Sequence, residues 1–388
     1  MAGYLDILRP NLFTQVVKQV VGSADPILNF MGFQPGGFNE KFMGHGREGV
    51  YHIYDDSRKV AKGRAPGTPA GRSSKQPMKA VAFTYPRMHD SVSLQAEFFH
   101  NIARISDPTQ RDEAGKDMIM RQAATLAQKA ANWRIAMTVG MLRDSLYYHE
   151  EGDDWFWNYT STSALAQVNF RVPAGNKTQL NMTDRAGTSV HSANILDLPW
   201  DNAGANIPLQ IAKINQARSV QGVGPVRNIF VNSVMWANVI ANDHLAAYAG
   251  TSNAPFKTYQ REIGQRPDGT ALHEYVGDFN VLPGITWHIT DEGLELWDAA
   301  NDVYTFTKHI PDTMALMMGE PNASQKYTCY LGSEPIAEYD GGPETVRVGT
   351  SAWTKKTSNP TSTECYVLDN ALAVPHDPYD LIPATVDF

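Results

Sequence analysis

A single uninterrupted helical pattern constrains this chain more than any other feature of its sequence. Asp107 is a suitable N-cap, Pro108 suits the first helical position, and no further proline occurs before Pro173. The pattern predicts a helix over 107–148, which at 1.5 Å per residue would be about 60 Å long. Such a helix is unusually long for a globular protein, and its alanine-rich stripe favours packing on a sheet over a coiled coil. The stripe has a spacing of three or four residues and consists of Ile119, Ala123, Leu126, Ala130, Trp133, Met137 and Gly140.

Patterns next to this helix indicate strands. Residues 80–85 show the alternation of a strand ahead of the helix. Behind it, the aromatic run 155–159 follows an acidic turn that would repel phosphates, which favours a core strand over a surface that stacks nucleic-acid bases. Short runs of asparagine, threonine and glycine predict small strands and hairpins between 168 and 190.

The second half of the chain alternates between helical and strand patterns. We expect a helix over 208–220, a buried strand over 228–231, and a second helix that Ser233 caps and that runs to about Tyr248. This order predicts a layered α/β unit. Further strands are predicted over 279–282, 285–289 and 303–307, and in the tail after 321.

The composition is that of a folded protein with two or three domains. The chain has 388 residues, of which 42% are hydrophobic, and this excludes a disordered or collagen-like chain. The two cysteines, Cys329 and Cys365, are too few for a disulfide framework or a cysteine zinc site. Because the sequence has neither a signal-peptide pattern nor a run of about 18 apolar residues, we expect a soluble protein in a reducing cytoplasm.

Charge is divided unevenly between two parts of the chain. Residues 47–79 carry eight basic and three acidic residues, whereas residues 270–388 carry five basic and 18 acidic residues. The net charges of +5 and −13 account for the formal charge of −8, which disfavours a general nucleic-acid binder. The basic segment is rich in glycine and proline and has almost no large apolar residue between Val60 and Met78, so it cannot form a core. It is either a solvated loop or an arm that binds a partner.

No catalytic or cofactor-binding motif is found along the sequence. The nearest approach to a phosphate loop, 67–73, has the wrong spacing and lacks the lysine. Gly222 and Gly224 precede a strand, where a dinucleotide loop would follow one, and His149 has no second histidine at the spacing of a zinc protease. We therefore predict no catalytic residue, no cofactor and no metal ion, and we expect both cysteines to be buried and unreactive.

The order of these segments resembles the major capsid proteins of tailed bacteriophages, most closely the lambda-like branch of the Hong Kong 97-type capsid fold. The likeness covers nearly the whole chain. It rests on the basic excursion 46–79, the helix 107–148 and the return segment, in which 280–287 leads to Phe306 and 310–317. That last stretch is similar to the family's Pro-Asp-x-Thr turn and the apolar strand that follows it.

This resemblance implies an α+β fold of the Hong Kong 97 type, divided into four parts. Residues 1–45 would be an N-terminal arm and 46–80 an extended loop that reaches over a neighbouring subunit. A peripheral domain with the long spine helix would hold 81–196 and 281–320, and an axial α/β domain would hold 197–280 and 321–388. The arm and the loop, about 80 residues together, are expected not to contribute to the subunit's own core.

The resemblance also implies a structural function without catalysis. Such subunits form hexamers and pentamers that close into an icosahedral shell around double-stranded DNA, without sequence-specific binding and without a membrane. Decoration and portal proteins would be further partners, and scaffolding would come either from a separate protein or from a segment cleaved before the mature form. The protein would be part of the virion and would assemble in the cytoplasm of the host bacterium.

The charge pattern then suggests how copies meet. We hypothesise that the basic loop docks on an acidic surface of the next copy, where complementary charge sets register and encounter rate. Two other functions stay open: a cellular nanocompartment shell of the same fold, or a soluble hydrolase or binding module. The residues assigned to the docking contact are Arg58, Lys59, Arg64, Arg72 and Lys75.

Overall fold

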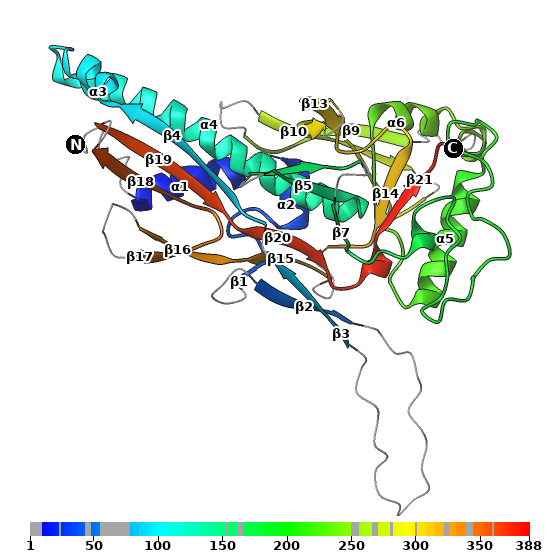
Figure 1. Ribbon diagram of the computed structural model, residues 1–388. Helices are drawn as coiled ribbons and strands as arrows, with labels where there is room; N and C mark the ends of the chain where they lie inside the picture. Colours follow the sequence, from blue (N-terminus) through cyan, green and yellow to red (C-terminus); the bar gives the residue numbers. More distant parts are fainter. Residues whose placement is uncertain are drawn as a thin grey trace, which may run out of the picture.

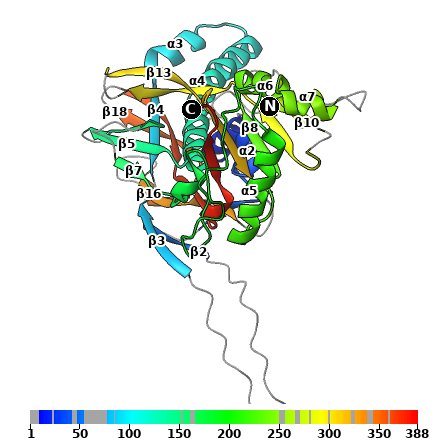
Figure 2. The same ribbon diagram turned by 90° about the vertical axis from the view of Figure 1, so that its right-hand side faces the viewer.

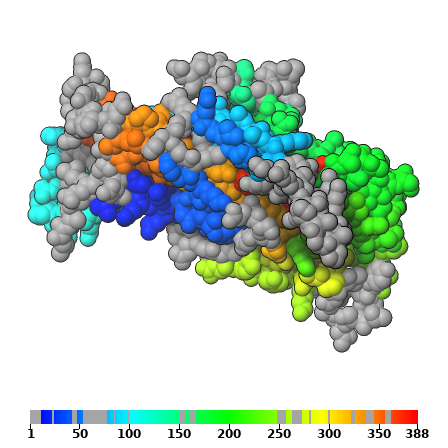
Figure 3. Space-filling view, turned by 90° about the horizontal axis from the view of Figure 1, so that it is seen from below, coloured from blue at the N-terminus to red at the C-terminus, as the bar shows by residue number. Residues whose placement is uncertain are grey.

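The chain folds into an elongated molecule with helices at both ends, as the computed structural model shows (Figure 1). α3 (Ala96–Ala103) and the first turns of α4 (Pro108–Arg143) form one end, and α5 (Ile207–Gln221) lies at the other. These ends are cyan and green in the view from below (Figure 3). The structure describes residues 10–22, 25–42, 48–54, 78–84, 86–151, 154–160, 166–249, 256–265, 271–279, 282–298, 301–321, 326–337, 344–358 and 361–388.

The predicted long helix is confirmed as α4, although it ends earlier than expected. Asp107 caps it, because its Oδ1 atom accepts a hydrogen bond from Thr109 N at 2.8 Å. The helix has 36 residues and is about 54 Å long. It ends at Arg143 because Asp144 adopts a left-handed conformation with φ 46°, and strand β5 (Leu146–Glu151) follows. Trp133 is partly buried, and the rest of the predicted stripe is buried: Ile119, Ala123, Leu126, Ala130, Met137 and Gly140.

A six-stranded mixed sheet lies towards the α5 end of the molecule. Two of its central strands, β8 and β11, run parallel to each other, and the other described pairings in this sheet are antiparallel. The predicted strand 228–231 is confirmed as β8, and 310–313 forms the expected turn, in which Met314 N donates to Pro311 O at 3.1 Å. The order is β21 (Ile382–Thr385), β14 (Met314–Met318), β8 (Asn228–Val231), β11 (Thr286–Ile289), β10 (Ala271–Phe279) and β9 (Phe256–Gln265).

Two of the predicted boundaries in this region are wrong. The strand predicted over 279–282 is placed differently: β10 ends at Phe279, and Leu282 lies in a turn where its carbonyl accepts from Ile285 N, while 280 and 281 lie outside the described residues. The helix after β8 is capped by Asn232 and not by Ser233, because the Asn232 side chain accepts from Met235 N at 2.8 Å. That helix is also interrupted, since Asn242 caps a new helical turn. The two helices are α6 (Ser233–Ile240) and α7 (Asp243–Ala249).

The stretch between 168 and 190 contains fewer strands than its composition suggested. β7 (Ala166–Val168) ends where the stretch begins, and a single 3-10 turn, η2 (Ala174–Asn176), follows. Gln179 and Leu180 both have left-handed φ angles of 48° and 51°, which interrupt the extended backbone of a hairpin. One hairpin-like turn is present, because Thr183 and Ser189 form an isolated antiparallel bridge and Asp184 N donates to Thr188 O at 2.8 Å.

Two three-stranded sheets pack against α4, so the prediction that the long helix lies on a sheet is confirmed. The β18–β19–β4 sheet buries Ala352 and Val367 against the first half of the helix, and the β1–β15–β20 sheet buries Cys329 and Ala373 near its second half. The strands are β18 (Ser351–Ser358), β19 (Thr361–Asp369), β4 (Met88–Gln95), β1 (Glu40–Phe42), β15 (Tyr327–Leu331) and β20 (Ala371–Pro375).

The N-terminal arm is part of the subunit's own core, contrary to expectation. It forms α1 (Pro10–Gly22) and α2 (Pro26–Met31) before β1. Phe13 and Val17 of α1 are fully buried against α4 and the β18–β19–β4 sheet. Met31 and Phe33 are fully buried in the central core. The expectation was wrong because it was based on position in the chain and did not weigh the apolar spacing within 13–33.

The remaining strands form hairpins around these layers. β5 pairs with β6 (Asp154–Asn158) and β7, and the aromatic run is confirmed as a strand whose Trp157 is buried. β2 and β3 project from the lower side of the body (Figures 1 and 2). The other bounds are β2 (Glu48–Tyr54), β3 (Met78–Thr84), β12 (Gly293–Asp298), β13 (Val303–Lys308), β16 (Ser333–Ala337), β17 (Glu344–Val348) and the short turn η3 (Pro378–Asp380).

The six-stranded sheet takes its strands from the ranges expected for both the axial and the peripheral domain. The six-stranded sheet combines β8 to β10 from 197–280 with β11 and β14 from 281–320. Among the described tail strands, β15, β18, β19 and β20 pack around α4, and β21 pairs within the six-stranded sheet. Strand pairing here joins segments that are distant along the chain. None of the helices within the described ranges is long and apolar enough to cross a membrane.

Candidate assembly surfaces

The base of the predicted extended loop is a two-stranded ribbon. β2 and β3 pair in register from Glu48 opposite Thr84 to Tyr54 opposite Met78. Tyr51 and Ile53 are buried on the central core, so the ribbon is anchored to the body. The predicted docking residues Arg58, Lys59, Arg64, Arg72 and Lys75 lie outside the described residues.

A buried histidine fixes this ribbon to the tail of the chain. His376 Nδ1 lies 2.7 Å from the backbone oxygen of His52, and its Nε2 lies 3.1 Å from Thr328 Oγ1. Burial lowers the pKa of His376, which favours the neutral ring. The neutral tautomer that donates from Nδ1 to His52 O and accepts from Thr328 satisfies both contacts. Next to it, burial raises the pKa of Tyr51 to about 12.

The acidic charge of residues 270–388 divides into a buried part and an exposed part. Glu274, Glu334, Asp369 and Asp380 are buried, and each pairs with a base of the same subunit. A carboxylate that is buried and paired in this way contributes little to attraction at the surface. The acidic surface on which the basic loop is predicted to dock must therefore be formed by other acidic residues.

The exposed acids concentrate on one hairpin. Asp291, Glu292 and Glu295 are exposed, and Asp302 is exposed in the turn between β12 and β13. Two large aromatic side chains, Tyr304 and Phe306, are 61% and 63% exposed beside them. Phe306 is opposite Glu295 in the β12–β13 register, so acid and aromatic ring share one face. We call residues 291–298 and 301–308 the acidic hairpin.

The acidic hairpin is held firmly to the body. Trp297 is buried because His149 stacks on it at 5.3 Å and Phe156 at 4.8 Å between ring centroids. The Asn158 side chain also donates to the backbone oxygen of Trp297 at 2.6 Å. These side-chain contacts hold the hairpin against the β5–β6 strands, and its exposed face is already formed in the single subunit.

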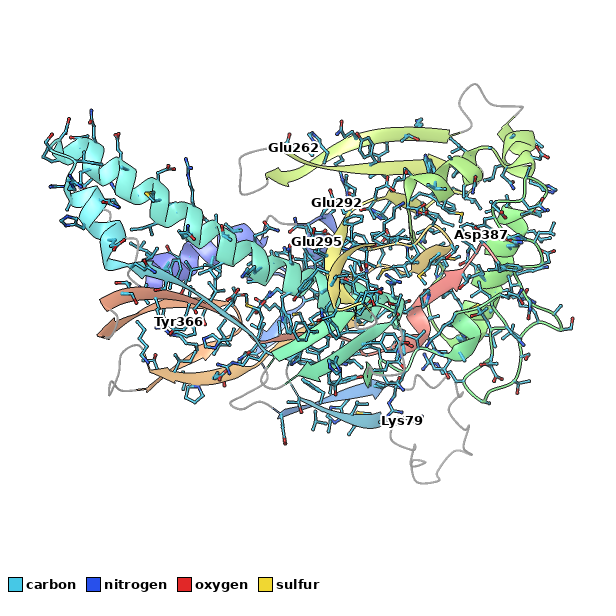
Figure 4. The ribbon with its side chains drawn as sticks, turned by 45° about the horizontal axis from the view of Figure 1, so that its top comes forward. Lys79, Glu262, Glu292, Glu295, Tyr366 and Asp387 are labelled. Atoms are coloured by element: carbon cyan, nitrogen blue, oxygen red, sulfur yellow. The ribbon has the colours of Figure 1, made fainter. Side chains whose placement is uncertain are left out.

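The loop ribbon and the acidic hairpin lie on opposite sides of the molecule. Figure 4 shows Lys79 on β3 at the lower side of the molecule, below Glu292 and Glu295. Figures 1 and 2 agree on this placement for β3 and β13. A contact between two such surfaces is therefore easiest to make between different copies of the chain.

Two internal ion-pair networks fix the relative positions of the elements. Arg134 of α4 binds Asp369 through Nε at 2.6 Å and through Nη2 at 3.0 Å. Its Nη1 reaches the arm at Phe33 O (2.8 Å) and Glu40 Oε1 (2.7 Å). Burial alone would lower the pKa of Arg134, but the Asp369 carboxylate holds it above its ordinary value, so the guanidinium stays charged.

The second network surrounds Asp380 at the end of the six-stranded sheet. Its carboxylate accepts from Arg218 Nη2 at 2.6 Å, from Lys326 Nζ at 2.8 Å and from the Tyr327 hydroxyl at 2.5 Å. Burial would raise the pKa of Asp380, yet Arg218 and Lys326 hold it below its ordinary value. Sequence reasoning missed both networks because their partners are up to 235 positions apart.

Comparison with known proteins gives structural matches only. No protein-family model matches the sequence, and no curated protein matches it. A crystal structure of a phage-related protein from Bordetella bronchiseptica RB50 superposes with a TM-score of 0.50 at 8% identity, covering 99% of this chain and 97% of that one. The chain has the same fold as that phage-related protein. The predicted α+β fold is thereby confirmed as one that a phage-related protein also adopts.

Other similar structures come from phage particles. A chain of the satellite phage P4 procapsid matches with a TM-score of 0.43 at 11% identity, covering 97% of this chain and 91% of that one. A chain from the capsid asymmetric unit of cyanophage A-1(L) matches with a TM-score of 0.43 at 13% identity, covering 93% and 92%. At these identities the likeness concerns the fold.

Proposed function

We propose that this protein is the major capsid protein of a tailed bacteriophage. Copies of it would form the hexamers and pentamers of an icosahedral shell that encloses double-stranded DNA. The observation that carries this proposal is the placement of two candidate contact surfaces, the loop ribbon and the acidic hairpin, on opposite sides of one subunit. Surfaces so placed favour head-to-tail contacts, which close into rings when the rotation between copies is right.

Within this proposal, the basic loop of one copy docks on the acidic hairpin of the next. Arg58, Lys59, Arg64, Arg72 and Lys75 would face Glu292, Glu295 and their acidic neighbours. The charge pairs would guide approach and register, while Tyr304 and Phe306 would supply buried apolar area. Scaffolding, decoration and portal proteins would be separate partners, and the shell would assemble in the bacterial cytoplasm as part of the virion.

A charge exchange between the two surfaces tests the docking. Arg72→Glu with Lys75→Glu should reduce shell assembly at least tenfold while the subunit stays folded, because like charges would face each other. Glu292→Lys with Glu295→Lys should have the same effect. Combining all four changes should restore a substantial part of assembly, measured as the particle fraction in sedimentation.

The matched control reverses two bases outside the loop, Lys18→Glu and Arg104→Glu, with the same change in net charge. We expect assembly of this control to stay within about twofold of the unchanged protein, since exposed single charges contribute little. Normal assembly of the loop variant, or no recovery in the fourfold variant, would refute docking of the loop on the acidic hairpin.

A further inference from the structure

A cavity opens where the parallel strands of the six-stranded sheet end. β8 ends at Val231 and β11 at Ile289, but β10 and β9 pair onward from Tyr275 to Ala271. Beyond these two strand ends the sheet consists of β10 and β9, and residues of α2 and α6 line the opening beside them. The volume is about 570 Å³, within the usual range for small-ligand sites, and such sites commonly lie beyond the carboxyl ends of parallel strands.

The lining of this cavity combines aromatic rings with carboxylates. Phe230, Trp236 and Tyr275 contribute aromatic surface, and Glu274, Asp291 and Glu292 contribute carboxylates. Neither lysine nor arginine occurs among its described lining residues, which are Pro26, Ile27, Phe230, Ser233, Trp236, Thr258, His273, Glu274, Tyr275, His288, Ile289, Thr290, Asp291 and Glu292. Such walls repel anions and attract cations with an apolar or planar body.

The three carboxylates have different roles. Glu274 is buried and forms hydrogen bonds with His288 and with Arg261, the latter at 2.5 Å. Burial would raise the pKa of Glu274, but those two neighbours hold it below its ordinary value, so its charge is already matched inside the protein. Glu274 therefore adds little to the attraction for a ligand.

Asp291 and Glu292 stand at the rim of the cavity, and Glu292 is labelled in Figure 4. Asp291 Oδ1 accepts from Ser233 N at 3.2 Å and lies 4.0 Å from Lys308 Nζ. That ammonium group is much closer to Asp312, at 2.7 Å, so it neutralises Asp291 only weakly. The side chain of Asp291 is 49% exposed and can accept an incoming donor.

We propose that this cavity binds an organic cation, specifically the guanidinium group of an arginine side chain. A guanidinium is planar, stacks on aromatic rings, and forms paired hydrogen bonds with a carboxylate. In this cavity it would lie against Trp236 or Tyr275 and donate to Asp291 and Glu292. The site lies within the single subunit and shares Asp291 and Glu292 with the acidic hairpin, but binding of a free guanidinium does not require assembly of a shell.

Calorimetric titration of the full chain with Nα-acetyl-argininamide tests this site. We expect saturable binding that weakens with added salt, and at least tenfold weaker binding of Nα-acetyl-citrullinamide, which has the same shape without the charge. The Asp291→Asn, Glu292→Gln double variant should also bind at least tenfold more weakly. The control variant Asp201→Asn, Glu320→Gln removes the same charge from exposed residues outside the lining and should bind normally.

Three results would overturn the proposal: no binding by the unchanged protein, equal binding of the citrulline compound, or unchanged affinity of the cavity variant. Circular dichroism of each variant separates lost binding from lost folding. Titrating assembled particles identifies the source of the arginine. Particles that no longer bind the probe indicate that a second copy supplies the side chain, and particles that bind as the subunit does indicate a free ligand.

Discussion

Individual buried side chains in this protein hold together segments that are far apart in the sequence. His376 is the clearest case, because it joins the loop ribbon at His52 to strand β15 at Thr328. Nothing in its local sequence, which is a Pro-His-Asp triplet, indicates this position. The contact could be seen only after strands from both ends of the chain were placed side by side.

This histidine makes stability depend on pH in a defined direction. Because burial lowers the pKa of His376 in the folded state below its ordinary value of about 6.5, the unfolded chain binds more protons as the pH falls. Its stabilising contribution is therefore complete above about pH 6.5 and is lost as the pH falls below that value. We expect urea unfolding at pH 7.5 and 5.5 to show this loss, and His376→Gln to reduce the difference between the two pH values. An unchanged difference in that variant would contradict the assignment. His89, whose pKa is also lowered by burial, accounts for part of the slope that remains.

At the level of elements, the spine helix was largely predictable because its signals are local. The cap at Asp107 and the apolar stripe lie within the helix itself, and both were found as expected. Its end was not predicted, since it depends on the left-handed backbone of Asp144 and on Leu146 packing against Gly140. A Cβ atom on Gly140 would lie 2.7 Å from Leu146 Cδ1, so the helix and β5 approach there as only glycine allows.

The arm differs from the spine helix. Its sequence has an apolar pattern with helical spacing that indicates a buried helix, although the arm was expected to lie outside the core. Phe13, Val17, Val20 and Val21 have helical spacing, and all four are buried. Which surface they cover depends on contacts across the chain, as between Thr14 and Ala352, whose hydroxyl and backbone groups exchange two hydrogen bonds of 2.8 and 3.1 Å. The acidic hairpin could likewise be predicted only in part. The net charge of residues 270–388 indicates an acidic surface, but a count of charges does not separate buried acidic residues from exposed ones.

Arg134 is where the arm, the spine helix and the tail meet, and its removal should weaken all three. Arg134→Met leaves the Asp369 carboxylate buried without its main partner, which we expect to cost about 3–5 kcal/mol of unfolding free energy. Arg121→Met, which removes an exposed pair with Asp117 on the same helix, should cost less than about 0.5 kcal/mol. Urea unfolding of both variants measures the difference. Equal stability of the two would show that the network does not fix these elements.

The whole molecule is an elongated subunit whose arm and tail are bound into its own core. The sequence predicted that the first 80 residues stand apart from that core. Several described arm residues between 13 and 33 are instead buried in it, so the folded body is larger than the sequence suggested. What distinguishes the molecule is its two outward surfaces, a ribbon at the base of a basic loop and an acidic, aromatic hairpin on the other side.

We propose that the surfaces of this subunit bind other copies of the same chain. Measuring the state of assembly of the purified protein tests this proposal most directly. Purified full-length protein should be examined by analytical sedimentation and negative-stain microscopy over a range of protein concentration and ionic strength. The proposal predicts closed particles tens of nanometres across. A protein that stays a stable monomer or small oligomer under all of these conditions would contradict it.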